Sequence, residues 1–413
     1  MSLSRITPIF LNITALSRLI YNLTLISFVF LVGFMLEEEQ VNRIFTTLAI
    51  IQMTASFMSF GFGANIIKPL LDTPNKQRNS VVLHIILLKI GFVLFATILI
   101  EQFNLLNQIS PLVVFLTLLG SVWSFADIYV ELMSLKRYKQ YFVLKAILSV
   151  FSLALKFTLI KINVELLYYF LTIEGLFPLA FFLLTHVNKD STREGVKIVY
   201  FKQVYKLIRH GIFIWSSSFL QIGGSRLLYL IINVLVPYRF SAFYYIFLRL
   251  VEGLMFIPNN ICASFFKKII NKQYDILVQE ELRYKMLTNC LLSSIIASPA
   301  LFVVLYLYSK FKDITIENYF LLLPIIIGVT VLSFVRIWIS REIVLNENLI
   351  ASPISYTFGF LFTMICVYFL ANHGMWIVIS LLVYYLVCSI VPFTIYSSRM
   401  KSTYKLLKKL CHV

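Results

Sequence analysis

Long apolar segments alternate with short polar ones along the whole chain, and this pattern predicts membrane-spanning helices. A helix needs about 20 apolar residues to cross the hydrocarbon core of a bilayer. Twelve segments of this kind, each bounded by charged or turn residues, lie at 13–36, 43–67, 80–100, 110–132, 141–161, 164–186, 209–236, 240–264, 286–308, 317–339, 349–370 and 374–396. The pattern therefore predicts an all-α polytopic membrane protein with about twelve transmembrane helices.

The composition supports lipid as the main solvent of the chain. Hydrophobic residues make up 60% of the sequence and charged residues 13%, whereas a soluble domain carries about 25% charged residues. The loops between twelve spans are too short to hold a soluble catalytic domain. The five cysteines lie in apolar stretches or in the tail, without the paired spacing of a disulfide framework or a zinc site, and we interpret them as packing residues.

Lysine and arginine residues predict the orientation of the spans. With the N-terminus inside the cell, 25 of them fall in cytoplasmic segments and 5 in outer loops. This distribution follows the positive-inside rule and places both termini in the cytoplasm. The net charge of +17 then reflects attraction to anionic lipid headgroups rather than to nucleic acid.

A polar interval at 187–208 divides the spans into six and six. The division predicts an N-lobe of residues 1–197 and a C-lobe of residues 198–413, the latter ending in a short basic tail. A shift of 199 residues pairs the second span with the eighth and places Lys68 on Lys267. Parallel repeats of this kind are typical of alternating-access transporters, which bind substrate between their lobes.

Three local motifs carry a resemblance to a known family. An acidic outer turn, Glu-Glu-Glu-Gln, occupies residues 37–40; the second span closes with Phe-Gly-Phe-Gly-Ala-Asn at 60–65 and then Lys68; and residues 131–141 lead from the fourth span directly into the fifth. In these motifs and in its layout the chain resembles the polysaccharide-transporter branch of the multidrug/oligosaccharidyl-lipid/polysaccharide exporter (MOP) superfamily, in particular the O-antigen (Wzx-type) flippases.

The resemblance implies a function in the synthesis of O-antigen, a part of lipopolysaccharide. Members of the family carry undecaprenyl-pyrophosphate-linked oligosaccharide from the cytoplasmic to the periplasmic leaflet of the bacterial inner membrane. The expected partners are this lipid-linked substrate, membrane lipids, and the polysaccharide polymerase and chain-length proteins. We expect neither enzyme activity nor a cofactor.

Charged residues within the predicted spans are the candidate functional residues. Six are basic: Lys89, Lys145, Lys156, Arg226, Arg249 and Arg336. Four are acidic: Asp127, Glu131, Glu174 and Glu252. Because an ionised side chain at mid-helix costs about 2.5–3.5 kcal/mol on insertion scales, these residues should face one another or water. A central cavity lined mainly by cations explains them most simply.

Helical phase groups some of these residues. Lys145, Ser149, Ser152 and Lys156 fall on one face of the fifth span, where they form a polar stripe. Asp127 and Glu131, by their spacing, lie one turn apart near the inner end of the fourth span.

Other charges are placed by their local sequence. Arg249 and Glu252 are three residues apart and can neutralise each other. Arg226 follows two glycines, at 223–224, that allow close helix approach or bending. Glu174 lies beside Gly175, with Pro178 one turn on, which indicates an irregular helix at mid-membrane.

We expect the fixed cations to hold the pyrophosphate of the substrate, while Ser, Asn, Gln and Tyr bind its sugar hydroxyls. The alternative is that some charges reach the headgroups or form structural ion pairs. For Lys89 and Lys145 this alternative is as well supported as substrate binding, and for Arg249 with Glu252 it is better supported. Arg226 and Arg336 have no carboxylate within a turn on their own spans, which favours substrate binding. Among the possible coupling carboxylates, Glu174 is the main candidate because desolvation should raise its pKa.

Two other classes of function stay open. A polytopic O-antigen polymerase or ligase usually displays a large periplasmic loop, which these predicted short outer loops do not provide. A drug or small-solute exporter of the same superfamily ordinarily depends on intramembrane carboxylates, whereas cations are more numerous here. The sequence contains no Walker A motif, no metal-binding histidine spacing and no GxSxG motif.

Overall fold

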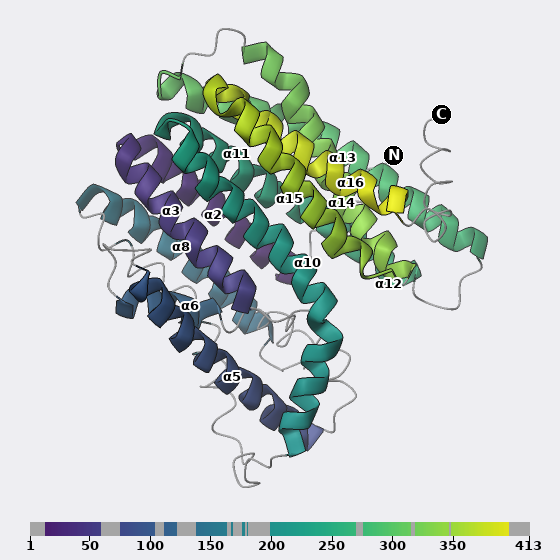
Figure 1. Cartoon of the computed structure of the whole chain (residues 1–413). Helices are drawn as coiled ribbons and strands as arrows, with labels where there is room; N and C mark the ends of the chain where they lie inside the picture. Colours follow the sequence, from purple (N-terminus) through teal and green to yellow (C-terminus); the bar gives the residue numbers. More distant parts are fainter. Residues whose placement is uncertain are drawn as a thin grey trace. The chain divides into compact units, whose positions relative to one another are not determined.

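A computed structural model of the chain describes residues 13–58, 75–103, 111–121, 138–162, 199–269, 276–314, 319–346 and 348–395, with isolated positions at 167, 176–177 and 180. Within these ranges the regular elements are α-helices and two short 3-10 helices (Figure 1). The all-α fold class predicted from the sequence is confirmed for this part of the chain.

Internal contacts divide the chain into two compact units, residues 1–45 with 228–413 (unit 1) and residues 46–227 (unit 2). Unit 1 holds α2 (Ile13–Met35), the first turns of α3 (Glu38–Met58), the last turns of α10 (Val199–Leu235), α11 (Tyr238–Leu254), α12 (Phe256–Ile269), α13 (Ile276–Phe311), η4 (Tyr319–Leu321), α14 (Leu322–Leu345), α15 (Ala351–Leu370), η5 (Ala371–Val378) and α16 (Ile379–Ile395). Unit 2 holds the rest of α3 and α10, with α5 (Asn75–Gln102), α6 (Pro111–Ser121) and α8 (Tyr138–Ile162). The predicted lobes, 1–197 and 198–413, stay a prediction.

Small residues allow the helices of unit 1 to pack closely. Gly359 of α15 lies so near α16 that an added Cβ would overlap the Sγ of Cys388. On α11, a Cβ at Gly253 would overlap the side chain of Ile26 from α2. Because lipid-embedded helices are held together largely by van der Waals contact, such close crossings contribute strongly to the packing of this unit.

One predicted span, 240–264, is two helices in the structure. α11 ends at Leu254, and α12 begins at Phe256. Pro258 explains the break, because it has no N–H to donate to the carbonyl of Leu254 and its ring crowds that carbonyl. The combined segment Tyr238–Phe266 is still long and apolar enough to cross a membrane.

Two helices begin earlier than the hydrophobic pattern predicts. α10 starts at Val199 and α13 at Ile276, ten residues before their predicted spans. In the first turns of α13, Glu281 and Lys285 form an ion pair at i and i+4, a spacing that supports a helix without an apolar face. Hydrophobicity therefore marks only the part of each helix that lies in lipid.

Seven segments in the described part of the chain are long and apolar enough to cross a membrane: Leu16–Met35, Lys139–Ile162, Trp215–Leu235, Tyr238–Phe266, Leu277–Phe311, Tyr319–Leu345 and Ala351–Ile395. The last of these covers two predicted spans, joined by η5, where Gly374 adopts φ 57°. The chain is thus a multi-pass membrane protein, while the total of twelve spans and the cytoplasmic termini stay predictions.

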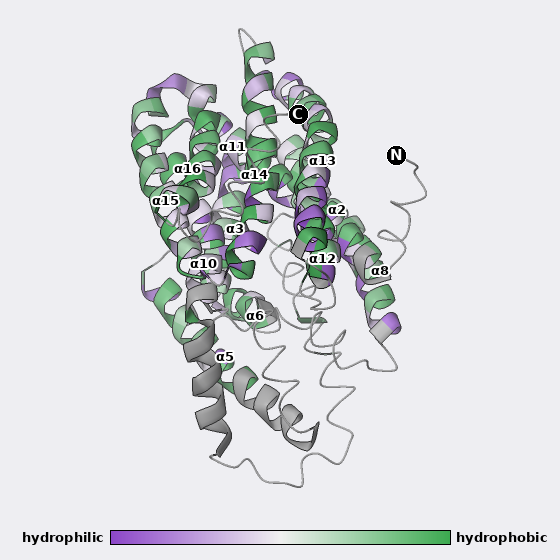
Figure 2. Ribbon diagram, turned by 90° about the vertical axis from the view of Figure 1, so that its right-hand side faces the viewer, coloured by the Kyte–Doolittle hydropathy of each residue, from purple (hydrophilic) through white to green (hydrophobic). Residues whose placement is uncertain are grey.

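Large apolar side chains lie on the outside of these helices. On α15, Phe362, Ile365 and Tyr368 are exposed, whereas the small polar residues Ser355 and Thr363 are buried. Figure 2 shows hydrophobic residues over most of α15 and α16. This distribution, the reverse of that in a soluble protein, is expected where lipid surrounds the helices.

Candidate functional site: buried basic residues

Seven of the ten charged residues selected from the sequence lie in the described part of the chain. Lys89, Lys145, Lys156 and Arg226 belong to unit 2, and Arg249, Glu252 and Arg336 to unit 1. Asp127, Glu131 and Glu174 lie outside the described residues, so their proposed roles stay predictions.

Arg336 of α14 is enclosed by the neighbouring helix α15. Its side chain is buried, with 2% of the residue exposed. Nη2 donates to the hydroxyl oxygens of Ser352 and Ser355, each at 3.2 Å. The guanidinium also lies over the ring of Tyr356, 4.4 Å from its centroid. Hydroxyl groups and an aromatic face therefore hold this cation without neutralising it.

The guanidinium of Arg336 has hydrogen-bonding capacity to spare. Nε and Nη1 are buried without an acceptor, and in the described part of the chain no carboxylate lies within 4 Å of the group. The hydroxyl of Tyr384 on α16, whose ring stacks 6.4 Å from that of Tyr356, is also buried without a partner. Because an uncompensated buried charge is costly, an anionic partner would stabilise this cluster.

Arg249 and Glu252 of α11 form the ion pair that their spacing predicted. Nη1 of Arg249 lies 2.9 Å from Oε2 of Glu252, and both side chains are partly buried. The pair neutralises much of the charge of Arg249, which makes this residue a weaker anion site than Arg336.

An aromatic cluster continues from this ion pair. Arg249 lies 5.9 Å from the ring centroid of Tyr245, which stacks on Phe45 at 4.5 Å and contacts Tyr229 at 4.6 Å. The hydroxyl of Tyr229 is 3.3 Å from Oδ1 of Asn42. The cluster combines apolar ring faces with hydroxyl and amide groups, the combination that suits a sugar ring.

In unit 2, Arg226 connects α10 to α3. Its Nε donates to Oε1 of Gln52 at 2.7 Å, and 2% of the residue is exposed. The helices come close at Gly223, where an added Cβ would lie 3.3 Å from Oγ of Ser56. The close approach predicted from the two glycines is therefore present, and the partner Gln52 is a residue that sequence reasoning did not select.

The polar stripe predicted on the fifth span is present on α8 and is largely buried. Ser149, Ser152 and Lys156 are buried and Lys145 is half-buried, whereas Phe151 on the opposite face is 59% exposed. Lipid-facing apolar residues thus cover one side of α8, and the basic residues turn away from it.

Lys89 of α5 is also enclosed. None of its surface is exposed, although Leu87 and Phe95 on the same helix are more than half exposed. The side chain of Lys89 therefore lies inside the protein in this structure, and its role in substrate binding stays a prediction.

Sequence reasoning missed a second buried ion pair. Arg283 of α13 binds Glu342 of α14 through Nε, at 3.1 and 3.0 Å from the two carboxylate oxygens, and through Nη2. Glu342 is completely buried. The predicted spans ended before Glu342 and began after Arg283, so both residues were assigned to loops; the longer helices bring them together.

Two solved structures share the fold of this chain. A eukaryotic MATE transporter, AtDTX14, aligns with a TM-score of 0.62 at 14% identity, over 96% of this chain and 96% of that one. An inward-facing multidrug resistance MATE family transporter of the MOP superfamily aligns with a TM-score of 0.59 at 14% identity, over 95% and 96%. Neither a family sequence model nor a curated protein matches the chain. The chain is a multi-pass membrane protein with the fold of the MATE transporters.

Proposed function

We propose that this protein is an alternating-access flippase that moves undecaprenyl-pyrophosphate-linked oligosaccharide from the cytoplasmic to the periplasmic leaflet of a bacterial inner membrane. The MATE fold supports a transporter and favours it over the polymerase and ligase alternatives. The observation that carries the choice of substrate is the uncompensated guanidinium of Arg336.

The chemistry of Arg336 fits a phosphate group. Two of its N–H donors already contact serine hydroxyls, while Nε and Nη1 have no acceptor. A phosphate oxygen that accepts from these groups would form charge-assisted hydrogen bonds, which are stronger than neutral ones. Since the site is closed in this conformation, the proposal requires that α14 and α15 separate during the transport cycle.

The rings of the aromatic cluster around Tyr245 are buried against one another in this structure, so the proposal requires that the transport cycle exposes them to the sugars. The polyprenyl chain can remain in lipid throughout. Arg226 of unit 2, held by Gln52, is a second candidate cation.

Transport in proteoliposomes tests the role of Arg336. A fluorescent undecaprenyl-pyrophosphate-linked oligosaccharide is placed in one leaflet, and its appearance in the other is followed by quenching. Hydrogen bonds to charged groups contribute about 1.5–3 kcal/mol, so Arg336→Ala should slow transport about ten- to a hundredfold. Arg336→Lys should keep part of the rate, since the charge survives without the planar fork.

Arg341→Ala is the matched control. Arg341 lies on the same helix but contacts the ring of Phe266, so its removal should leave transport unchanged. Wild-type rates with Arg336→Ala in normally folded protein would refute the role of this residue.

A drug exporter is the second candidate, because one of the structures with this fold is a multidrug resistance transporter. The partly neutralised pair of Arg249 and Glu252 would suit a cationic solute better than Arg336 does. The same vesicles decide between the two functions: movement of a lipophilic cation without movement of the lipid-linked oligosaccharide would establish the exporter.

A further inference from the structure

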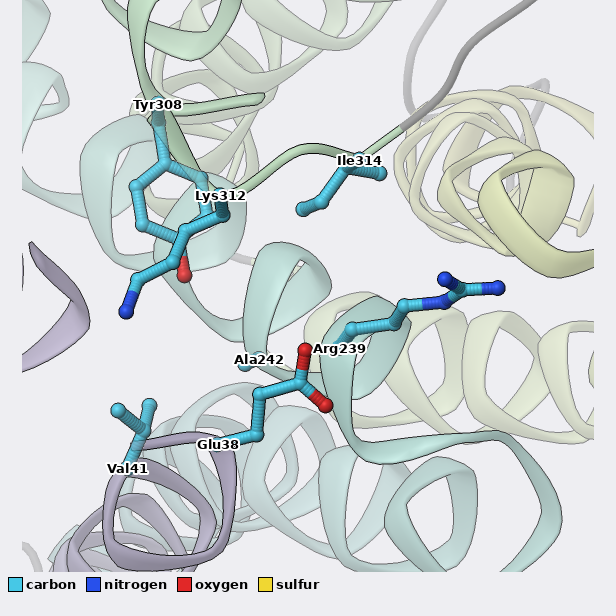
Figure 3. A pocket seen from close by; sticks show the side chains of 7 residues that line it. All are labelled: Glu38, Val41, Arg239, Ala242, Tyr308, Lys312 and Ile314. Carbon is cyan, nitrogen blue, oxygen red and sulfur yellow. The ribbon is translucent and has the colours of Figure 1, made fainter. Parts of the chain in front are cut away.

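A pocket of unit 1 is lined by residues at the ends of several helices (Figure 3). Arg336 is not among these residues. The pocket encloses about 230 Å³, counting its open mouth, and is lined by Glu38, Val41, Arg239, Ala242, Tyr308, Lys312 and Ile314. These residues come from the start of α3, the start of α11, and the end of α13 with the turn that follows. Three charged groups thus gather around a small apolar floor.

The charged residues of this pocket lie at the ends of apolar spans. Glu38 follows the span Leu16–Met35, Lys312 follows Leu277–Phe311, and Arg239 is the second residue of Tyr238–Phe266. Residues at the ends of spans stand at the level of the phospholipid headgroups. The pocket therefore faces headgroups and water, not hydrocarbon.

The three charges of the pocket do not pair with one another. Glu38 forms no ion pair in the part of the chain that the structure describes. The ammonium of Lys312 donates to the carbonyl oxygen of Leu36 at 2.9 Å, which leaves two of its three N–H groups. In Figure 3 the carboxylate of Glu38 lies between the ends of the Lys312 and Arg239 side chains. The pocket thus presents both signs of charge at separate points.

Two further observations favour an anion at Lys312. Partial burial lowers the pKa of Lys312, and the charge of Glu38 only partly opposes this effect. The hydroxyl of Tyr308 points into the same space (Figure 3). A phosphate group at this point would restore the solvation that the ammonium has lost.

Exposed apolar residues at the same helix ends indicate that the ligand is a lipid. Met35 of α2, Val234 and Leu235 of α10, and Phe311 of α13 are 37%, 83%, 47% and 62% exposed. Met35 lies three residues before Glu38, and Phe311 lies directly before Lys312, so the acyl chains of a lipid held at these charges would reach them. A soluble phosphate compound would make no use of them.

We propose that this pocket binds a phospholipid with an ethanolamine headgroup, its phosphate on Lys312 and Tyr308 with Arg239 nearby, and its ammonium on Glu38. By contacting both Glu38 and Lys312, such a lipid would stabilise the packing of the start of α3 against the end of α13. The proposal is independent of the transported substrate, because it concerns a different part of unit 1.

Native mass spectrometry of the full-length protein in detergent tests the proposal. The protein is titrated with phosphatidylethanolamine, with phosphatidylglycerol, which has the phosphate but no ammonium, and with soluble phosphoethanolamine, which has no acyl chains. Because one charged contact at a partly exposed site contributes up to about 1 kcal/mol, phosphatidylethanolamine should bind about three- to fivefold more tightly than phosphatidylglycerol. Phosphoethanolamine should bind far more weakly than either lipid.

Two variants test separately the contact of the lipid ammonium with Glu38 and the contact of the lipid phosphate with Lys312. Glu38→Gln should abolish the preference for phosphatidylethanolamine and leave phosphatidylglycerol binding unchanged, whereas Lys312→Ala should weaken both. Glu39→Gln and Lys310→Ala are the matched controls, since both residues lie at the same ends of the same helices without lining the pocket. Equal binding of the two lipids, an equal effect of the control variants, or equally tight binding of phosphoethanolamine would each overturn the proposal.

Discussion

Arg226 and Arg336 are both enclosed arginines, but their immediate surroundings differ. The amide oxygen of Gln52 accepts from Arg226, while serine hydroxyls and a tyrosine ring hold Arg336. Each of these neighbours orients the guanidinium without cancelling its charge. In the described part of the chain no carboxylate pairs with Arg336, so its positive charge is not neutralised as that of Arg283 is by Glu342.

A substitution at Gln52 can test the charge of Arg226 without changing how its side chain packs. Gln52→Glu would convert the neutral contact into an ion pair of nearly the same shape. We expect the melting temperature in detergent to stay equal or rise, while transport of the lipid-linked oligosaccharide falls about tenfold, the effect of losing about 1.4 kcal/mol of anion binding. Gln40→Glu, the same change at an exposed position of α3, is the control. Undiminished transport by Gln52→Glu would show that the charge of Arg226 is not used.

Only part of the surroundings of Arg336 could be predicted from the sequence. The absence of a carboxylate within a turn selected Arg336; its helix α14 does carry Glu342, but that carboxylate pairs with Arg283 of α13. The groups that contact Arg336 lie on the next helix, at Ser352, Ser355 and Tyr356, and the rotation of α15 against α14 is set by packing. A single sequence contains no measure of that rotation.

At the scale of helices, the crossing of α15 and α16 is the tightest contact that a single substitution can test. Gly359→Ala places a methyl group against Cys388, and overpacking of this kind costs about 1–3 kcal/mol. We expect a melting temperature several degrees lower. Cys388→Ala removes the obstructing sulfur, so the double variant should recover most of the loss.

Gly91 of α5 provides the matched control for this substitution. Nothing lies within 4 Å of a Cβ added there, so Gly91→Ala should leave the melting temperature unchanged or raise it through better helix propensity. A similar loss in Gly91→Ala and Gly359→Ala would show that the contact with Cys388 is not the cause.

The hydrophobic pattern predicted the positions of helices better than their ends. α2 and α15 lie close to the predicted spans 13–36 and 349–370, because their limits coincide with the limits of the apolar run. The first turns of α13 are polar and belong to the aqueous side, so hydrophobicity could not detect them. Pro258 was visible in the sequence, but membrane helices often tolerate proline, and its presence alone did not predict a break.

For the whole molecule, the remaining question is the source of energy. In the proposed function the pyrophosphate of the substrate carries about two negative charges, and export would move them toward the positive side of the membrane. Each charge gains about 2.3 kcal/mol per 100 mV, so the potential could supply about 4–5 kcal/mol per turnover. We expect proteoliposomes with a clamped potential and equal pH on both sides to transport the lipid-linked oligosaccharide at a rate that increases with voltage.

Glu174→Gln tests the competing mechanism, proton antiport, in the same vesicles. We expect this variant to follow voltage as the wild type does. Transport that is driven by a pH gradient at zero potential, and that disappears in Glu174→Gln, would instead assign proton coupling to this residue.

The position of the contacts to Arg336 also affects how the chain is made. α14 leaves the ribosome with an arginine that has no partner, and the groups that hold it arrive only with residues 352–356. At about 5–20 residues per second, this delay lasts about 1–4 s. During that interval the high hydropathy of the Tyr319–Leu345 segment must keep the helix in the bilayer. A substitution that lowers this hydropathy would therefore act during synthesis, before any transport occurs.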